Sequence, residues 1–256
     1  IFETLINQYK ALHSISHLQL CQNKAGNFIV IRHTKAIPDE AKSYVQEAAN
    51  AQQWLITWQD NSDVIEQAHL PTPYYFLEKF KLKFEFGLGN FIQVNDEVNQ
   101  AMLAQSVNWL NLQGNEQVLD LFCGIGNFSL VLAQHAKSVI GVEAVAMATQ
   151  NAQTNSITNA HFHCFDLTQK IETAQWFNKA LDVLVLDPSR TGAMAVLEQL
   201  PLKQFKTILY VSCDPVTLAR DSAIISQAGF EVTKIGLMNM FPHTGHIETM
   251  ALFQRR

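Results

Sequence analysis

The sequence lacks the features that define several protein classes. Its four cysteines, Cys21, Cys123, Cys164 and Cys213, form no C-x-x-C pair and have no histidine at metal-ligand spacing, which argues against a zinc or iron–sulfur site in this chain. So few cysteines in 256 residues also argue against a disulfide framework. No apolar run approaches the ~20 residues that span a bilayer, and no secretory signal opens the chain. We therefore expect no membrane association and a cytoplasmic location.

Basic residues are also scarce, because 18 Lys and Arg against 23 Asp and Glu give a formal net charge of -5. Nucleic-acid binding draws much of its affinity from cations on phosphates, so this balance argues mildly against a nucleic-acid partner. A local basic patch remains compatible with it. Lys79, Lys81 and Lys83 form the most basic local feature, although an ordinary solvated strand face has the same pattern.

Residues 1–90 have the pattern of a small α+β domain. Asn23–Asn27 separates two strand-like runs, as in a hairpin, and a proline opens the one segment with helical spacing. Residues 77–86 alternate polar and apolar side chains with a period of two, which predicts a strand with one polar face. We expect strands over 17–20, 28–33, 54–58 and 77–86 and a helix over 38–51.

Residues 91–256 alternate apolar strands with helices after a bridging helix over 95–110. The expected strands cover 117–122, 138–143, 160–165, 180–186, 206–212, 231–240 and 248–253, and the expected helices cover 127–135, 144–156 and 215–228. Such alternation predicts an α/β domain of Rossmann-like type, with a parallel sheet covered on both faces. Ligands of these sheets bind beyond the carboxyl ends of the strands, so the residues that follow each strand are the candidate site.

A nucleotide is the ligand that the first three strand ends favour. Gly124 and Gly126 follow the first strand and allow a tight turn, but Ser129 stands where a dinucleotide fingerprint has its third glycine. Glu143 ends the next strand, where a carboxylate can accept both hydroxyls of a ribose. Asp166 ends the third strand, where it can meet an adenine amino group. Each acid taken alone is also compatible with a strand-end cap or a solvated loop.

The next two strand ends carry groups suited to covalent chemistry. The fourth strand runs into Asp187-Pro-Ser-Arg-Thr-Gly192, which lacks the aromatic residue of amino-group methyltransferases. The fifth runs into Cys213, directly before a helix that begins with proline. A helix N-terminus favours the thiolate, and we expect Arg190 and Arg220 to add positive charge nearby.

A thiolate at this place suits the methylation of uracil at carbon 5. Its addition to carbon 6 turns the ring into an enolate whose carbon 5 is nucleophilic, and a base must then remove the carbon-5 proton so that the thiolate can leave. Glu248 is the best candidate for that base. His243 and His246 are alternatives, for the same role or for orienting the base or a phosphate, although a lone histidine is more often structural.

Six motifs together resemble the RNA uridine-5-methyltransferase family: FIQVN, LDLFCGIGNFSL, GVEAV, LDPSRTG, YVSCDPVTLARD and MFPHTGHIETMALFQR. The resemblance covers the chain from about Phe91 to its end. The closing motif and the early segment IVIRHT look more like the branch that modifies 23S rRNA than like the tRNA branch or the other rRNA branch.

The resemblance implies a class I S-adenosylmethionine-dependent methyltransferase domain, a 23S rRNA substrate, and a role for each matching residue. Cys213 would be the nucleophile and Glu248 the base. Phe91 would stack on nucleobases, and Asp187 would also contact the target base. The residues expected to line the S-adenosylmethionine site are Gln93, Phe122, Asn127, Glu143, Asp166 and Asp187.

Two departures from the family pattern matter. Asp214 replaces the usual asparagine beside the nucleophile, and a carboxylate facing the sulfur would oppose thiolate formation. The family's TRAM domain and four-cysteine iron–sulfur site are absent from this chain, which begins at Ile1, so we expect a fragment of a longer, monomeric protein. The alternatives are an amino-group or small-molecule methyltransferase, which would not need Cys213, and a non-catalytic RNA-binding module.

Overall fold

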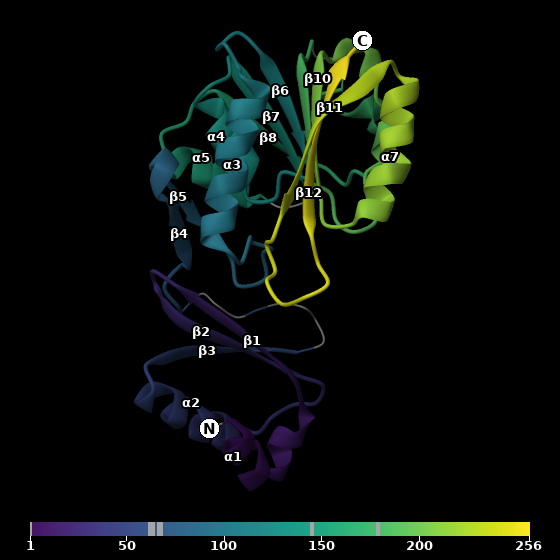
Figure 1. Cartoon of the computed structure of the whole chain (residues 1–256). Coiled ribbons are helices and arrows are strands. Elements are labelled where there is room, and N and C mark those ends of the chain that lie inside the picture. Colours follow the sequence, from purple (N-terminus) through teal and green to yellow (C-terminus); the bar gives the residue numbers. More distant parts are fainter. Residues whose placement is uncertain (1, 61–64, 66–68, 144–145, 178–179) are drawn as a thin grey trace. The chain divides into compact units, whose positions relative to one another are not determined.

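The computed structural model describes the whole chain except residues 1, 61–64, 66–68, 144–145 and 178–179 (Figure 1). The chain divides into two compact units. Unit 1 comprises Ile1–Tyr75 and Glu85–Asn90, and unit 2 comprises Phe76–Phe84 and Phe91–Arg256. The short segment Phe76–Phe84 thus groups with unit 2, whereas the predicted functional boundary at residue 90 stays a prediction.

Unit 1 is built on a three-stranded sheet with helices packed on it. The strands are β1 (Ile15–Asn23), β2 (Gly26–His33) and β3 (Trp54–Gln59), with β2 in the middle, antiparallel to β1 and parallel to β3. The helical segments are α1 (Phe2–Gln8), the 3-10 turn η1 (Lys10–Ser14) and α2 (Asp39–Ala51). Apolar side chains of β2 and α2 meet in the core, including Ile29, Ile31, Ala41 and Val45. The predicted hairpin, helix and third strand are therefore present.

The predicted continuous strand over 77–86 is wrong. Strand β4 (Tyr74–Leu77) is followed by a 3-10 turn, η2 (Glu78–Phe80), and then by β5 (Leu82–Glu85), and the two strands pair as a separate sheet. Lys81 breaks the alternation because it adopts a left-handed conformation with φ of 56°. The three lysines consequently belong to a turn, a bend and a strand and share no single strand face.

Unit 2 contains a seven-stranded sheet in the order β11-β12-β10-β9-β6-β7-β8. Strands β8 (Ala160–Cys164), β7 (Ser138–Glu143), β6 (Gln117–Leu121), β9 (Val183–Leu186) and β10 (Thr207–Ser212) run parallel. Strand β12 (Glu248–Arg255) is antiparallel to β10, and the edge strand β11 (Phe230–Met238) is antiparallel to β12. The sheet is therefore mixed, because its last two strands reverse direction.

Helices cover this sheet, and side-chain caps mark where two of them begin. Asn95 accepts a hydrogen bond from Val98 N at the start of α3 (Asp96–Leu110), and Asp214 caps α7 (Pro215–Gln227). Helix α4 packs against β6, β7 and β8, and α7 packs against β10 and β11 (Figure 1). The remaining helical segments are α4 (Asn127–Ala133), α5 (Met147–Thr154), η3 (Ile171–Thr173), α6 (Met194–Leu197) and η4 (Leu202–Gln204). The predicted start of α5 at Ala144 lies outside the described residues.

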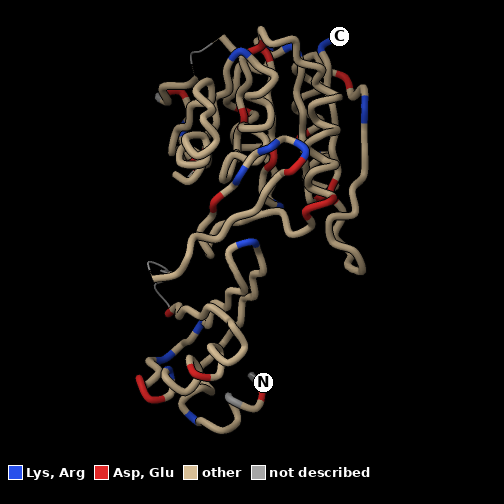
Figure 2. Tube along the Cα trace, turned by 90° about the vertical axis from the view of Figure 1, so that its left-hand side faces the viewer, with Lys and Arg blue, Asp and Glu red and all other residues tan. Residues whose placement is uncertain are grey.

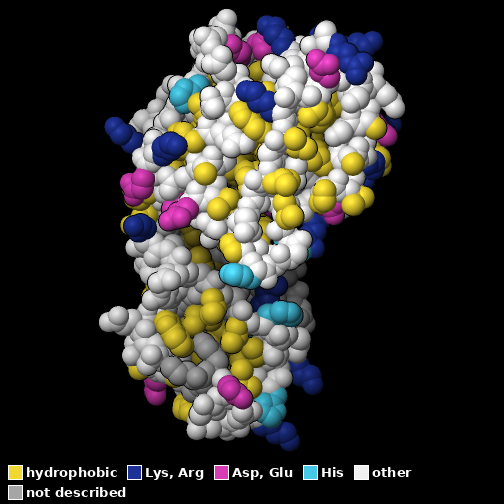
Figure 3. Space-filling model, in the orientation of Figure 1, with side chains coloured by type: hydrophobic (Ala, Val, Ile, Leu, Met, Phe, Trp, Pro, Cys, Tyr) yellow, Lys and Arg dark blue, Asp and Glu magenta, His cyan; other side chains and the backbone are white. Residues whose placement is uncertain are grey.

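The core of unit 2 is filled by the apolar strands. Leu119, Leu184, Ile208 and Phe253 are fully buried between sheet and helices, and each such side chain stabilises the fold by about 1.5–3 kcal/mol. Figure 3 shows hydrophobic side chains gathered over part of the unit 2 surface as well, and the edge strand β11 exposes large ones such as Ile235 and Leu237. Within the described part of the chain, no helix is both long and apolar enough to cross a membrane.

Candidate active site

The carboxyl ends of the five parallel strands bring most of the predicted site residues to one edge of the sheet. Phe122 follows β6, Glu143 ends β7, and Asp166 lies just past β8. Asp187 follows β9 and Cys213 follows β10. Because β12 runs the opposite way, its first residue, Glu248, lies at the same edge. Residues that are spread over more than a hundred positions of the sequence thus lie along one edge of the sheet.

Cys213 directly follows β10 and Glu248 begins β12, each one residue beyond the last pair of the ladder between these strands. The ladder between β10 and β12 pairs Ser212 with Thr249, and the next residues on the two strands are Cys213 and Glu248. Glu248 is buried, with 5% of its surface exposed, and Cys213 is half-buried. The structure therefore places a thiol and a carboxyl group near each other in a partly enclosed setting, and the charge of Glu248 acts on Cys213.

The pKa of the Cys213 thiol is raised above its ordinary value, so the prediction of a lowered pKa is wrong in direction. Burial is the largest cause, followed by the negative charge of Glu248, and the charge of Asp187 acts in the same direction. The hydrogen bond of its own backbone N–H and the charge of Arg190 lower the pKa, but by less. The effects of burial and of the two acids on the Cys213 pKa are therefore larger than the lowering expected from the start of α7.

The two acids nearest the thiol also have raised pKa values. Burial raises the pKa of Glu248. The pKa of Asp187 lies well above its ordinary value because of burial first, then the charges of Glu248 and Asp120. A carboxylate whose pKa is raised toward neutrality is a better proton acceptor at working pH. This arrangement suits the removal of a proton from a substrate bound against the thiol.

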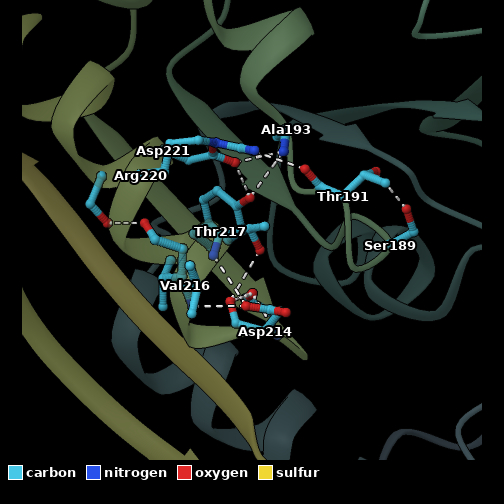
Figure 4. Close-up of polar contacts among 12 residues, drawn as sticks. Ser189, Thr191, Ala193, Asp214, Val216, Thr217, Arg220 and Asp221 are labelled. Carbon is cyan, nitrogen blue, oxygen red and sulfur yellow. Dashed lines mark hydrogen bonds and ion pairs between the residues drawn. The ribbon is translucent and has the colours of Figure 1, made fainter.

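Asp214 does not present its carboxylate to the sulfur. Its Oδ1 accepts hydrogen bonds from Val216 N at 2.8 Å and Thr217 N at 3.2 Å, at the first turn of α7 (Figure 4). Ser212 Oγ donates to the carbonyl oxygen of Asp214 and accepts from its N–H, which closes a tight turn around Cys213. An asparagine here would provide the same cap, so the departure from the family pattern preserves the local geometry.

Arg220 does not supply the positive charge that the sequence predicts for the thiol. Its guanidinium forms an ion pair with the buried carboxylate of Asp221, with Nη2 and Oδ1 2.7 Å apart. Nη2 also donates to Thr191 O. Arg190 is the arginine whose charge acts on Cys213.

The turn between β6 and α4 has the conformation of a ligand-binding loop. Phe122, Gly124 and Gly126 all adopt positive φ angles, of 63°, 54° and 95°. The amides of Phe122 and Cys123 donate to Val142 O, which fastens the turn to β7. A Cβ added at Gly124 would meet nothing within 4 Å, so the backbone there borders open space. A ligand can approach the chain closely at this glycine.

Two predicted residues flank this turn from neighbouring elements. Asn127 exchanges two hydrogen bonds with the buried side chain of Asn99 on α3, at 3.2 and 2.9 Å. Gln93, shortly before α3, has a buried Oε1 atom with no hydrogen-bond partner among the described residues. A buried acceptor without a partner is costly, so this atom is a candidate contact for the donor of a ligand.

The acids after β7 and β8 differ in their surroundings. Glu143 is half-buried at the end of β7, and its charge raises the pKa of Asp120 and Cys123. Asp166 is exposed and accepts hydrogen bonds from the backbone N and Oγ1 of Thr168, which lower its pKa. Both residues therefore lie at the strand ends, although both carboxylate oxygens of Asp166 already accept hydrogen bonds within its own turn, Oδ1 from Thr168 and Oδ2 from Gln169.

Sequence reasoning missed Asp120. This residue is completely buried inside β6, its Oδ2 accepts from Ser129 Oγ at 2.5 Å, and its Oδ1 has no partner among the described residues. Burial raises its pKa from 3.8 to about 7. An acid within the apolar run Gln117–Phe122 was the available signal, because a buried carboxylate is rare without a task or a partner.

The two histidines considered as alternative bases lie in the segment before β12 and are both exposed. His246 contacts Arg190, whose Nη2 lies 3.4 and 3.3 Å from the two ring nitrogens. Neither shares the ladder position that brings Glu248 to Cys213. Across the described residues, no group of three or more His, Cys, Asp or Glu side chains is arranged to hold a metal ion.

The strand order, the helical cover and the site at the carboxyl edge define a Rossmann-like fold of the S-adenosylmethionine-dependent methyltransferases. The structure superposes on the Pyrococcus abyssi tRNA (uracil-54, C5)-methyltransferase, solved in complex with S-adenosyl-L-homocysteine, with a TM-score of 0.74. The superposition covers 98% of this chain and 65% of that one, at 22% sequence identity. At this identity the likeness establishes the fold.

A model of the tRNA (uracil-5-)-methyltransferase family matches residues 64–256, and the chain belongs to this family. It is 75% identical over 260 residues to the 23S rRNA (uracil(1939)-C(5))-methyltransferase RlmD of Pseudoalteromonas translucida, covering 100% of this chain and 59% of that protein. It is 44% identical over 259 residues to RlmD of Shewanella amazonensis, covering 99% and 58%. The family resemblance of the motifs is thus confirmed, and the chain spans less than two thirds of these relatives.

Proposed function

We propose that this chain is the catalytic part of a 23S rRNA (uracil-C5)-methyltransferase of the RlmD type, which uses S-adenosylmethionine. The observation that carries the proposal is that Cys213 and Glu248 each lie one residue beyond the last β10–β12 pair, Ser212 with Thr249, at the carboxyl edge of the sheet, where the charge of Glu248 acts on the thiol. A methyltransferase acting on an amino group or an oxygen needs no thiol at this position. The names and identities of the two curated relatives favour 23S rRNA over the tRNA in the family's description.

The first step is addition of the Cys213 thiolate to carbon 6 of the uracil. The thiol releases its proton to solvent, the S–C6 bond forms, and the C5=C6 electron pair moves toward the carbonyl at carbon 4 as an enolate. Burial and the nearby acids disfavour the thiolate, whereas Arg190 favours it. Arg190 therefore offsets part of the cost of ionising a thiol beside two carboxyl groups.

Glu248 completes the reaction by removing the proton from carbon 5. After carbon 5 has gained the methyl group, the Glu248 carboxylate takes that proton, the C5=C6 bond forms again, and the S–C6 bond breaks to release the thiolate. Glu248 then returns its proton to solvent. Its raised pKa fits this role, because it holds the proton more readily than an exposed glutamate does.

The residues of the first three strand ends fit S-adenosylmethionine, which supplies the methyl group on a sulfonium. The open space at Gly124 and the unpartnered Oε1 of Gln93 are the features that favour a bound ligand here. Glu143 would accept the ribose hydroxyls and Asp166 the adenine amino group. The other residues that we propose to line the site are Phe122, Asn127 and Asp187.

The RNA side of the site rests on fewer residues. Phe91 is 73% exposed, and we propose that it stacks on a nucleobase. Acidic and basic residues are interspersed along the chain (Figure 2). Part of the affinity for rRNA would then come from regions that the relatives have and this chain does not span. A monomeric state, a cytoplasmic location and an iron–sulfur cluster in the longer protein stay predictions.

Trapping with RNA that carries 5-fluorouridine tests the proposal. Fluorine at carbon 5 blocks the final proton removal, so we expect a stable covalent complex between the chain and a 23S rRNA fragment in the presence of S-adenosylmethionine. Denaturing gels and mass spectrometry of the Cys213 peptide would detect it. Cys213→Ala must abolish the complex, and Cys164→Ala, at an exposed cysteine, is the matched control.

Two results would overturn the proposal. Full methyl transfer by Cys213→Ala would favour a different methyltransferase reaction. Binding of RNA without adduct and without transfer from labelled cofactor would favour a non-catalytic binding module.

A further inference from the structure

A buried carboxylate on α7 holds together three elements near the candidate nucleophile. Asp221 is completely buried, and its Oδ2 accepts hydrogen bonds from Tyr210 OH on β10 and from Ala193 N, both at 2.6 Å. Its Oδ1 accepts from Arg220 Nε at 2.8 Å. The hydrogen bonds from Tyr210 and Ala193 thus join α7 to the sheet and to the segment after β9, while Arg220 is the neighbour of Asp221 on α7 itself (Figure 4).

The segment that Asp221 holds is the tight turn Ser189–Gly192. Gly192 N donates to Ser189 O at 2.9 Å, and the guanidinium of Arg220 donates to Thr191 O at 2.8 Å. Gly192 has φ of 77°, and a Cβ there would lie 2.5 Å from Arg220 Nη2 and 2.6 Å from Asp221 Oδ2. Only glycine therefore lets the turn approach the carboxylate so closely.

Arg190 lies inside this turn. Its charge acts on Cys213, and its Nη2 contacts the ring of His246, in the segment that leads to Glu248. Cys213 itself directly precedes the cap of α7, the helix that carries Asp221. One helix is thus attached to the nucleophile at its start and, two turns later, to the turn that carries Arg190.

We propose that Asp221 is a positioning residue, which acts through Tyr210, Arg220 and the amide of Ala193 to hold the turn Ser189–Gly192, and with it the guanidinium of Arg190, in place at the carboxyl edge of the sheet. The catalytic meaning of this inference rests on the proposed function. The positioning does not, since it concerns the thiol and the guanidinium of the chain alone. A purely structural role would stabilise α7 without influencing the thiol.

The ionisation of Cys213 gives a readout that separates these roles. The groups acting on the thiol are Glu248 and Asp187, which raise its pKa, and Arg190 and its own backbone N–H, which lower it. If Arg190 moves away from its place, the Cys213 pKa rises further, and the thiolate fraction near neutral pH falls. Loss of helix stability alone predicts no such change in the folded protein.

The experiment measures the pH profile of Cys213 alkylation by iodoacetamide, without RNA or cofactor, with peptide mass spectrometry to resolve Cys213 from the other cysteines. Variants are Asp221→Asn, Tyr210→Phe, Arg190→Gln and the double variant Asp221→Asn/Arg190→Gln. Ser222→Ala is the matched control, because this neighbour on α7 donates only to Leu218 O in the same helix.

We expect Asp221→Asn and Arg190→Gln to lower the alkylation rate at pH 7 by a similar factor, roughly threefold, and the double variant to be no slower than either. Tyr210→Phe should show a smaller loss in the same direction, and it decides the question if Asp221→Asn does not fold. A profile unchanged in Asp221→Asn and Tyr210→Phe, or effects that multiply in the double variant, would overturn the inference. Failure of RNA trapping leaves this result untouched, so the two proposals fail separately.

Discussion

The acidic residues in the two halves of the carboxyl edge of the unit 2 sheet differ in burial and in the direction of their pKa shifts. Beyond β8, Asp166 is exposed, and its hydrogen bonds with Thr168 lower its pKa. Beyond β9 and at the start of β12, Asp187 and Glu248 are partly or fully enclosed, and burial raises their pKa values. An ionised acceptor suits the binding of hydroxyl and amino groups, whereas an acid with a raised pKa suits proton removal. One sheet edge thus offers two chemical environments a few strands apart.

The substitution Glu248→Gln is expected to have the largest effect on the difference between the two halves. We expect turnover to fall by about 10²–10⁴-fold, because the carbon-5 proton then has no positioned base. The same change removes a charge that raises the Cys213 pKa, so alkylation of Cys213 at pH 7 should become faster. Rates of methyl transfer and of iodoacetamide modification check the two effects.

The test is strict because the same substitution should slow methyl transfer and speed up the alkylation of Cys213. Glu198→Gln, at an exposed glutamate, is the control and should leave both rates unchanged. A slower alkylation in Glu248→Gln would contradict the placement of the two side chains next to each other. An undiminished turnover would mean that another group, such as His246, removes the proton.

Asp120 interacts electrostatically with both halves of the edge. The charge of Glu143 raises the pKa of Asp120, and the charge of Asp120 raises the pKa of Asp187. Its pKa is about 7 in the folded chain against 3.8 ordinarily, so the folded state holds the proton more tightly than the unfolded state. Stability from this group is therefore present at low pH and lost as pH rises between those values. Between pH 5 and pH 7 the loss amounts to roughly 2 kcal/mol, because the slope of about 1.4 kcal/mol per pH unit flattens near the folded-state pKa.

Asp120→Asn removes this titration. We expect the difference in unfolding free energy between pH 5 and pH 8 to shrink, with Ser129 still able to donate to the amide oxygen. Urea unfolding at the two pH values measures it. A remaining decline with rising pH would belong to Asp187 and Glu248, while an unchanged difference would show that Asp120 is not the group that titrates.

The smallest effect concerns the cap beside the nucleophile. Asp214→Ala should lower the free energy of unfolding by about 1 kcal/mol, because two amides of α7 lose their acceptor. Asp214→Asn keeps an acceptor oxygen, and we expect a change of only a few tenths of a kcal/mol. Thermal unfolding compares the two, and equal losses would argue against a capping role.

The sequence predicted the elements of this fold better than their pairing. Apolar runs and a proline-started helix located the strands and α7, since these signals are local. The single strand expected over 77–86 failed because Lys81 takes a left-handed conformation that alternation does not reveal. The reversal of β12 was also beyond local patterns, because strand direction depends on which neighbour the chain returns to.

In the candidate site, too, local features were predicted from the sequence, whereas features that depend on packing were not. Strand ends predicted that Cys213 and Asp187 lie at one edge of the sheet, because parallel strands end there, whereas Glu248 was a candidate base from its motif and reaches this edge because β12 is antiparallel. The direction of the Cys213 pKa was predicted wrongly, since burial and the charge of Glu248 depend on packing across strands. Arg220 was misplaced for a related reason, as the buried partner Asp221 next to it holds its guanidinium.

The antiparallel ladder between β10 and β12 makes the spacing of Cys213 and Glu248 independent of the segment 239–247 that precedes β12. Insertions or deletions in that segment can reshape what lies above the thiol while backbone hydrogen bonds keep the two reacting side chains abreast. Removal of one residue within β12 would instead turn Glu248 to the other face of the sheet. Under the proposed function, the choice of target can therefore change with this segment while the backbone pairing of β10 and β12 keeps Cys213 and Glu248 in register.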